Sequence, residues 1–238
     1  MITLYGTGPM FGLPHASPFA IKAEVLLKLS GLSYTNARAS YSKAPKGKIP
    51  YIEEGGRLIP DSTFIRFYLE DKHGIDFTGG YDARTQGIGW ALEKLMEDHV
   101  YWLNVNDRWL VDKNFYKGPI HFFDALPALL RPVVARLVRR KVRKNNHAHG
   151  IGRHSAAERL ELGKRAVDAT SVILAGNAYI LGDRVSGIDA TCYGFLLSLT
   201  CPLFASQIRE YAETKDNIMR YLARLSAEFF PELDHAKT

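Results

Sequence analysis

The chain has 238 residues, enough for one large or two modest domains, each with a buried core of its own. With 46% hydrophobic and 24% charged residues, its composition is that of an ordinary globular protein rather than a disordered one. The net charge is +6, but eight basic residues and no acidic residue lie between Arg131 and Arg153. The excess charge therefore belongs to one surface and not to the whole molecule.

Membrane-spanning and secreted classes are not expected. The longest apolar run, 190–206, is interrupted by Pro202 and is shorter than the roughly 20 residues that a spanning helix needs, so we expect a buried core helix. Residues 1–6 lack the basic start of a secretory signal. Cys192 and Cys201 would point to opposite faces of a helix that continued so far, and we do not expect them to pair. A reducing cytoplasm is the simplest location.

The order of predicted elements changes near residue 80. The first part reads as a strand (2–5), a helix (from Ser17 to Gly31), a strand (34–39), a hairpin (49–59) and a helix (from Asp61 or Ser62 to Gly74). After the Gly79-Gly80 linker, the pattern is helical almost throughout. We therefore expect a small α/β domain over residues 1–78, followed by an all-α domain over residues 82–238.

A serine stands where the first helix is expected to begin. Ser17 occupies the N-cap position and Pro18 the first helical position, and both residue types are typical of these places. A serine hydroxyl at a helix N-terminus also donates to a thiolate, which the helix dipole and the backbone amides stabilise further. Position alone leaves both interpretations open, a plain cap or a donor to a thiolate.

Two further residue pairs stand at the start of elements. At Ile49-Pro50, a cis peptide bond would turn the Ile49 amide and carbonyl toward another backbone, although trans is the usual form. At Asp61-Ser62, the carboxylate can meet an ammonium group while the hydroxyl and the helix amides meet a carboxylate. Taken singly, each pair also fits an ordinary turn or cap.

In combination, these residues resemble the N-terminal domain of the glutathione transferases, whose cytosolic members join a thioredoxin-like domain to an all-helical one. The separation of Pro50 and Ser62 by twelve positions also resembles theirs. The resemblance implies one residue at the glutathione sulfur and five along the rest of the peptide: Ser17 at the sulfur, Lys48, Ile49 and a cis Pro50 along the backbone, and Asp61 with Ser62 at the γ-glutamyl end.

The resemblance extends over nearly the whole chain. Ser186 and Asp189 stand at capping-box spacing before the apolar run, as in the core helix of these enzymes, and we expect a structural role for them. The glycine- and proline-rich loop before Ser17 and the segment 150–155 are most similar to the failed axon connections and metaxin-like branch. There a cysteine commonly follows Ser-Pro-Phe; here Ala20 stands in that place, which argues against a cysteine nucleophile.

Tyr5 is the rival of Ser17 as the thiol donor, because tyrosine-type transferases use a tyrosine at the end of the first strand. We favour Ser17, since its place at a helix start adds helix electrostatics. A hydrophobic electrophile is expected to meet the first long helix of the helical domain, although aromatic residues at this spacing are more typical of a core. The residues in question are Met96, His99, Trp102 and Trp109.

The basic segment from Arg131 to Arg153 alternates charged and apolar residues, among them Val133 and Leu137. This pattern is typical of a solvated helix face packed on the domain core; a membrane surface is a second interpretation that we do not favour. We expect no nucleic acid partner, because no nucleic-acid-binding motif accompanies the segment. We also expect no metal, because the nearby histidines lack cysteine or carboxylate neighbours.

The sequence therefore predicts a serine-type glutathione transferase, a cytoplasmic homodimer that uses glutathione as its co-substrate against a hydrophobic electrophile. The alternative is a non-catalytic module of the same fold that binds a protein partner or a membrane surface through the basic segment. Turnover of electrophiles separates the two better than glutathione affinity does, because a protein that has lost its activity can keep the site.

Overall fold

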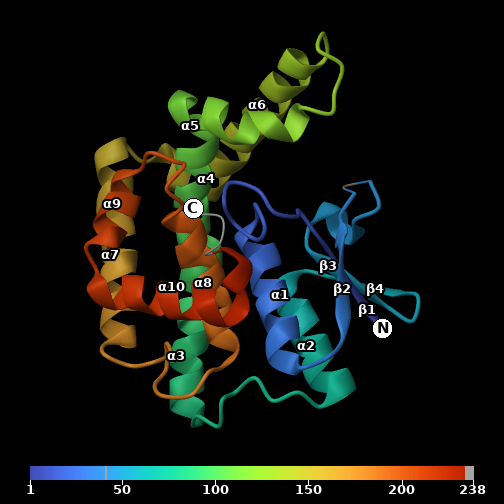
Figure 1. The fold of residues 1–238 in the computed structure, drawn as a ribbon. Helices are drawn as coiled ribbons and strands as arrows, with labels where there is room; N and C mark the ends of the chain where they lie inside the picture. The colour runs from blue at the N-terminus through green and yellow to red at the C-terminus, as the bar shows by residue number, and fades with distance from the viewer. Residues whose placement is uncertain (41, 234–238) are drawn as a thin grey trace.

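The computed structural model describes residues 1–40 and 42–233. Its first part is a four-stranded sheet with the order β2-β1-β3-β4, in which β1 is parallel to β2 and antiparallel to β3. Two helices cover one face and lie between the sheet and the rest of the molecule (Figure 1). In chain order, these elements are β1 (Ile2–Gly6), α1 (Pro18–Ser30), β2 (Tyr34–Arg38), β3 (Tyr51–Glu54), β4 (Arg57–Pro60) and α2 (Ser62–His73).

The alternation of side chains along β1 decides which residues meet the helices. Ile2 and Leu4 are buried in one cluster with Ile21 of α1. Because successive side chains of a strand point to opposite faces, Tyr5 lies on the other face, away from α1. This face assignment bears on the candidate thiol donors.

The second part is helical, as predicted. One continuous helix runs from residue 83 to residue 110 and contains two π-helical stretches. Its segments are α3 (Ala83–Lys94), η2 (Leu95–Val100), α4 (Tyr101–Val105) and η3 (Asn106–Leu110). The remaining helices are α5 (Asp112–Lys117), α6 (Arg131–His149), α7 (Ala156–Leu174), α8 (Gly187–Leu199), α9 (Gln207–Glu213) and α10 (Asp216–Phe229). Three short 3-10 turns are η1 (Pro45–Gly47), η4 (Pro119–Phe123) and η5 (Ile151–Arg153).

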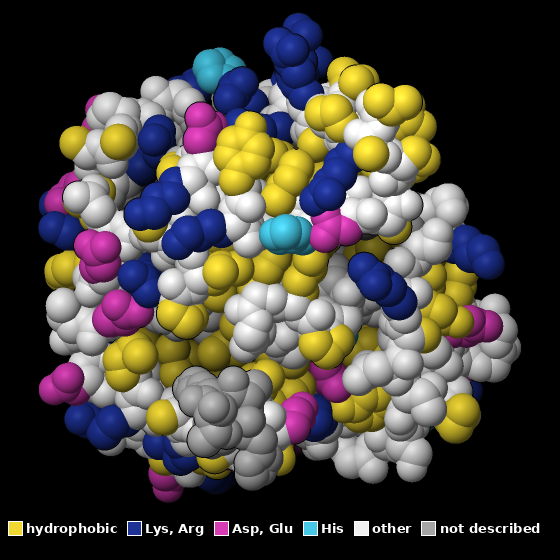
Figure 2. Space-filling view, turned by 45° about the horizontal axis from the view of Figure 1, so that its top comes forward, with side chains coloured by type: hydrophobic (Ala, Val, Ile, Leu, Met, Phe, Trp, Pro, Cys, Tyr) yellow, Lys and Arg dark blue, Asp and Glu magenta, His cyan; other side chains and the backbone are white. Residues whose placement is uncertain are grey.

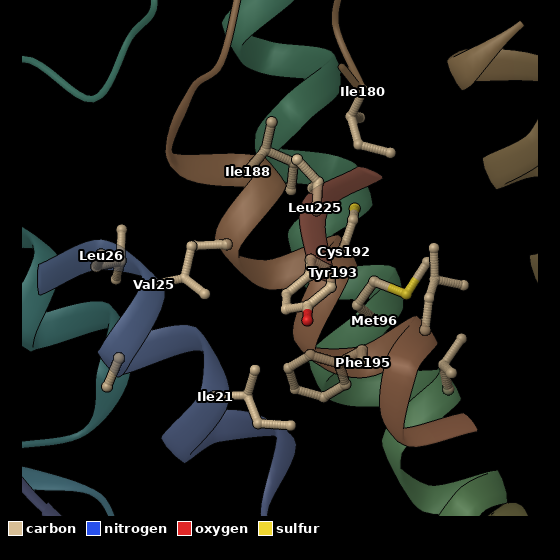
Figure 3. Packing of buried hydrophobic residues seen from close by; sticks show 14 of the residues in the cluster. Ile21, Val25, Leu26, Met96, Ile180, Ile188, Cys192, Tyr193, Phe195 and Leu225 are labelled. Carbon is tan, nitrogen blue, oxygen red and sulfur yellow. The ribbon is translucent and has the colours of Figure 1, made fainter. Parts of the chain in front are cut away.

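The two parts are joined by the packing of α1 against α8. Figure 3 shows Ile21 and Val25 of α1 pointing toward α8, where Tyr193 and Phe195 are buried. The backbones approach closely at Gly194, where an added Cβ would lie 2.8 Å from the carbonyl oxygen of Pro18. A residue with a side chain at this position would therefore push on the first turn of α1.

Asp189 anchors the start of α8, in the structural role that its spacing from Ser186 predicts. Its carboxylate accepts hydrogen bonds from the amides of Ser186 and Ile180, at 2.9 and 2.8 Å, and from the Tyr221 hydroxyl at 3.2 Å. Burial raises the pKa of this carboxyl group despite those bonds. The network joins the core helix to the segment before it and to α10.

The apolar run holds a shorter helix than its length suggests. α8 ends at Leu199, so Cys201 lies beyond it, and both Cys192 and Cys201 are buried, unpaired thiols. Within the described ranges, no helix has the length and apolar character needed to cross a bilayer. The boundary between the domains at residues 78–82 stays a prediction.

Candidate functional site

Ser17 stands at the N-terminus of α1, as the sequence predicts. Its backbone is extended, with φ −97° and ψ 127°, and its side chain forms no capping hydrogen bond. The backbone carbonyl accepts from the amides of Ala20 and Ile21, at 3.1 and 3.2 Å, which fixes the residue at the helix start. The hydroxyl is thus held beside the positive end of the helix without serving as its cap.

The loop that precedes Ser17 is fixed by a buried histidine. His15 Nδ1 accepts from the amide of Gly8 at 3.0 Å, so its Nε2 carries the hydrogen toward Glu24, 2.8 Å away. Glu24 also accepts from Tyr34 and Asn36 on β2. Although burial alone would raise the pKa of Glu24, the hydrogen bonds from His15 and Asn36 hold it below its usual range. The loop is therefore tied to both α1 and the sheet.

The second predicted group lies between β3 and η1. The Ile49-Pro50 bond is cis, the form that the resemblance to glutathione transferases implies. The Pro50 carbonyl accepts from the amide of Asp61 at 3.1 Å, which joins this turn to the start of α2. Lys48 extends into solvent, and its Nζ lies 3.7 Å from an Asp61 carboxylate oxygen. Lys48, Ile49, Pro50 and Asp61 therefore belong to one neighbourhood.

Asp61 and Ser62 begin α2 in an unusual way. Asp61 has a φ of 75°, a left-handed conformation that is costly for a residue other than glycine, and its side chain accepts from the amide of Thr63 at 3.1 Å. Ser62 is 1% exposed, and its hydroxyl has no hydrogen-bond partner within residues 1–40 and 42–233. Leaving a buried polar group unpaired costs about 1 to 3 kcal/mol. A carboxylate bound at this helix start would remove that cost.

A buried ion cluster lies beneath the start of α2. Lys22 of α1 is fully buried, and its Nζ lies 2.7 Å from Glu97 and 3.2 Å from Glu93, both on the long helix. The same nitrogen donates to Thr63, the neighbour of Ser62, at 3.0 Å. Burial alone would raise the pKa of Glu93, but the charges of Lys22 and Arg66 hold it below its usual range. This cluster joins both domains directly behind the candidate site.

The cluster also relates Ser17 to Ser62. Ser17 and Lys22 are five residues apart, which corresponds to about 7.5 Å along a helix axis. Lys22 contacts Thr63, which follows Ser62 in the chain. The structure thus brings the starts of α1 and α2 near one another across this cluster.

A second buried cation, which the sequence analysis missed, lies next to Ser17. Arg108, on η3, is buried, and its guanidinium donates to the carbonyl oxygens of Ala16, at 3.2 Å, and of Ser198. Over the described residues, it forms no ion pair with a carboxylate; it lies 4.6 Å from the ring centroid of Phe204. Burial lowers its pKa to about 10, so it stays charged at neutral pH.

Aromatic side chains cover the space beside Arg108. The Phe11 ring meets Phe204 and Phe122 edge to face, at 5.2 and 5.6 Å, and Trp109 stacks on Phe122 at 5.8 Å. Phe11 belongs to the loop before Ser17, so this aromatic wall adjoins the candidate thiol site. Nothing in the sequence around Phe11 or Phe204 signals this proximity, because the wall is formed by four separate segments.

The other residues expected near a second substrate lie elsewhere. Met96 is buried in the main core, and the Trp102 ring stacks on His149 at 4.8 Å. His99 is half-buried, and burial lowers its pKa. Of the four residues proposed from the sequence, Trp109 is the one that stacks within the aromatic wall, over the residues that the structure describes.

Tyr5, the rival donor, has its hydroxyl engaged. It donates to the Glu53 carboxylate at 2.9 Å, and its ring stacks on Tyr51 at 4.6 Å. The hydrogen bond to Glu53 raises the pKa of the Tyr5 phenol. Together with its position on the sheet face away from α1, this arrangement directs Tyr5 away from the helix start where Ser17 stands.

Two surface hollows lie outside the predicted site. One is lined by residues that include Arg66, Trp90 and Glu93, and the other by residues that include Lys46 and Phe64. Neither includes Ser17, Ile49 or Ser62. In the part of the chain that the structure describes, no three His, Cys, Asp or Glu side chains are grouped so as to hold a metal ion.

With this geometry established, comparison with known proteins identifies the family. Residues 18–114 match the model of the glutathione S-transferase N-terminal domain, and residues 163–225 match that of the glutathione S-transferase C-terminal domain. The chain belongs to the glutathione S-transferase superfamily. The N-terminal match includes the predicted residues from Lys48 to Ser62 and begins one residue after Ser17.

Two relatives match almost the whole chain. The isoprene-epoxide–glutathione S-transferase of Rhodococcus sp. (strain AD45) is 28% identical over 96% of this chain and 99% of its own. Failed axon connections of Drosophila melanogaster is 28% identical over 95% of this chain, which spans 57% of that protein. The second relative agrees with the branch that the sequence resembles.

Solved structures share the fold. The beta-etherase LigF from Sphingobium sp. strain SYK-6 has a TM-score of 0.66 at 16% identity, covering 99% of both chains. A glutathione transferase family member from Pseudomonas fluorescens pf-5, solved with two glutathione bound, has a TM-score of 0.59 at 19% identity and covers 95% of this chain and 88% of its own. These similarities support the thioredoxin-like and helical domains of the fold.

Proposed function

We propose that this transferase binds glutathione at the starts of α1 and α2 and transfers it to a small hydrophobic electrophile. The observation that carries the proposal is the buried, unpaired hydroxyl of Ser62 beside the strained Asp61. The γ-glutamyl end of glutathione has a carboxylate that suits Ser62 and the helix start, and an ammonium group that suits Asp61. Lys48, Ile49 and Pro50, which are joined to the start of α2 through Asp61, are proposed to meet the peptide backbone of glutathione.

Two groups are proposed to stabilise the thiolate. The Ser17 hydroxyl donates to it, and the charge of Arg108 acts through space from behind the neighbouring Ala16 carbonyl. At an effective dielectric constant of about 20, a thiolate held roughly 8 to 10 Å from this charge would gain about 2 kcal/mol. This energy equals roughly 1.5 pKa units, enough to raise the thiolate fraction at neutral pH substantially.

The reaction itself is an addition or a displacement at carbon. The glutathione sulfur gives an electron pair to the electrophilic carbon, a C–S bond forms, and the bond to the leaving oxygen or halide breaks. In an epoxide, the leaving oxygen stays in the product and takes a proton from water. The name of the Rhodococcus relative makes small epoxides the first electrophiles to test. The wall formed by Phe11, Trp109 and Phe122 provides apolar contacts for such substrates.

Ser17→Ala tests the proposed donor. We expect turnover to fall about 10- to 100-fold, the loss of a hydrogen bond to a charged group, and glutathione affinity to stay within about twofold. Because the hydroxyl caps nothing, the free energy of unfolding should change by less than about 0.5 kcal/mol. Tyr5→Phe is the control and should retain turnover; loss of turnover in Tyr5→Phe with none in Ser17→Ala would transfer the role to Tyr5.

A homodimer in the cytoplasm remains part of the proposal. Phe64 and Phe67 of α2 and Trp90 of α3 are exposed large aromatic side chains, and Phe67 stacks on Trp90 at 6.4 Å. Exposed apolar patches of this kind mark surfaces that are covered in an assembly. Phe67→Glu should convert the dimer to a monomer in sedimentation velocity experiments, and a wild-type monomer would refute the assembly.

Catalytic and non-catalytic versions of the fold are separated by turnover. If no small epoxide or halide is turned over while glutathione still binds, the chain is a binding module and the catalytic proposal fails. Loss of glutathione binding in Asp61→Asn, independent of any electrophile, would still support the binding site.

A further inference from the structure

Residues 129–149, which contain α6, form an arm that has no part in the proposed glutathione site. It stands out from the helical part at the upper right of Figure 1. Figure 2 shows hydrophobic side chains lying beside Lys and Arg side chains over this part of the surface.

One face of the arm is packed as the sequence predicts. Ala135 is buried with Phe115 and Phe123, and Val134 and Val138 pack against that cluster. Arg139 also faces inward: it donates to the carbonyls of Trp109 and Leu110 and pairs with Asp112. These contacts fix the arm to the end of the long helix that carries Arg108.

The opposite face differs from the prediction of a simple solvated surface. Four large aliphatic side chains lie exposed at its N-terminal end: Leu129 (89% exposed), Leu130 (55%), Val133 (57%) and Leu137 (61%). Val133 and Leu137 are four residues apart and therefore share one side of the helix. Contiguous exposed aliphatic groups mark an interaction surface rather than an ordinary solvated one.

The charges on this face lack counterions. Arg131 pairs with Asp124 and Arg139 with Asp112, but the other basic residues of α6 form no ion pair with any described carboxylate. They are exposed, and they are Arg136, Arg140, Lys141, Arg143 and Lys144. Arg140 and Lys144 continue the spacing of Val133 and Leu137, so an aliphatic end passes into a basic stretch along one side of the helix.

We propose that this face of the arm docks on an anionic phospholipid surface. The exposed aliphatic groups enter the boundary between headgroups and acyl chains, while the unpaired basic residues remain among the anionic headgroups. A second copy of the chain suits the face poorly, because a two-fold contact would bring the same basic residues against one another. The combination of aliphatic tip and unpaired charge is what a lipid surface requires.

Docking would also orient the rest of the molecule. Arg139 ties the arm to Trp109, and Trp109 belongs to the aromatic wall beside Arg108. The wall would then lie near the membrane, where hydrophobic electrophiles accumulate. This consequence rests on the proposed function, whereas the docking itself does not.

The test measures co-sedimentation of the full chain with vesicles. One set contains phosphatidylcholine alone, and the other contains roughly one third phosphatidylserine. We expect binding to the anionic set and a decline with rising salt, because the attraction acts within a Debye length of about 8 Å at physiological ionic strength. The charge variant carries four Gln substitutions, at Arg136, Arg140, Lys141 and Lys144.

A matched control keeps the charge count equal. It carries four Gln substitutions at exposed basic residues that form no ion pair over the described chain: Arg38, Lys72, Arg84 and Arg220. We expect the arm variant to lose at least about tenfold in vesicle partition, since each basic residue near an anionic surface contributes about fivefold, and the control to lose much less. A second variant, Leu129→Ser with Val133→Ser, should also reduce binding.

Glutathione binding and circular dichroism verify that each variant is folded, because the proposed peptide site lies in the other domain. Equal vesicle binding by the arm and control variants, or no binding by the wild type to anionic vesicles, overturns the proposal. A shift of the Leu129→Ser/Val133→Ser variant to a smaller assembly in sedimentation velocity, without any loss of vesicle binding, assigns the face to contact between copies and also overturns it.

Discussion

The two ends of the interface between the domains bury a cation in opposite ways. At one end, the ammonium group of Lys22 lies between the carboxylates of Glu93 and Glu97 and donates to the Thr63 hydroxyl, so its partners in the described chain include two opposite charges. At the other end, Arg108 contacts carbonyl oxygens and the Phe204 ring, with no carboxylate partner in the described chain. Both cations adjoin α1, one beneath Thr63 and the other beside Ala16.

The difference separates a structural charge from one available to a ligand. The field of Lys22 is cancelled within the cluster, so it holds α1, α2 and the long helix together but acts little beyond them. The field of Arg108 is not cancelled, so a nearby anion gains from it. We infer that the same interface provides rigidity at one end and electrostatic stabilisation at the other.

Lys22→Met should give the largest effect, on stability. It leaves Glu93 and Glu97 buried with reduced compensation, and removing one partner of a buried ion pair costs about 3 to 5 kcal/mol. Urea unfolding measures this loss, and Lys94→Met, which removes a partly exposed member of the same cluster, should cost much less. An equal loss of unfolding free energy in the two variants would show that the buried Lys22 pair stabilises the fold no more than the partly exposed Lys94 pair does.

Asp61→Asn tests whether glutathione binds at the end of the interface where Lys22 is paired with carboxylates. Asparagine tolerates the left-handed backbone and still accepts from the Thr63 amide, so the fold should persist. Loss of the charge should weaken glutathione binding by about 1.5 to 3 kcal/mol, measured by titration calorimetry. Unchanged affinity would show that the ammonium end of glutathione binds elsewhere.

Arg108→Met is the matched counterpart of Lys22→Met. Because no carboxylate is left unpaired, the free energy of unfolding should fall by less than about 2 kcal/mol, which covers the lost hydrogen bonds to carbonyl groups. The pKa of bound glutathione, followed by thiolate absorbance, should rise by roughly 1.5 units. The pH dependence of turnover should move upward by the same amount, since more alkaline solution is then needed to form the thiolate. A stability loss as large as that of Lys22→Met, with an unmoved thiol pKa, would make Arg108 purely structural.

Ser62→Ala should give the smallest effect. The hydroxyl has no partner to lose and is buried unpaired, so the free energy of unfolding of the ligand-free protein should rise by up to about 1 kcal/mol, while the binding free energy of glutathione weakens by about 1 kcal/mol. Thr63→Ala, next along the helix, is the comparison: it breaks the contact with Lys22 and should affect stability instead. The reverse pattern would place Ser62 in the fold and Thr63 in the site.

Much of the fold was predictable because it is coded locally. Ser17, Pro18 and Gly31 mark the ends of α1, and the glycines at 55 and 56 mark the β3–β4 turn, since caps and turns depend on residues only a few positions apart. The structural role of Asp189 also follows from its spacing from Ser186, whereas the cis Ile49-Pro50 bond was implied by the family resemblance, since the local sequence favours trans.

The residues that sequence reasoning missed depend on distant partners. A lysine in the middle of α1 reads as an exposed residue, and its burial is explained only by Glu93 and Glu97, more than seventy positions later. The burial of Arg108 is likewise explained only by its hydrogen bonds to the carbonyl groups of Ala16 and Ser198, about ninety positions away on either side. The alternating pattern of α6 could not show which apolar residues face inward, because that is decided by a cluster formed from other segments.

The close approach at Gly194 bears on how this protein could be recombined with its relatives. A Cβ there would lie 2.8 Å from the Pro18 carbonyl oxygen. The first turn of α1 can therefore occupy its position only because residue 194 of the helical half has no side chain. A chimera that joins the first half to a helical half with a bulkier residue at this point would displace Ser17 without altering any residue of the first half. The two halves are therefore expected to exchange only as matched pairs.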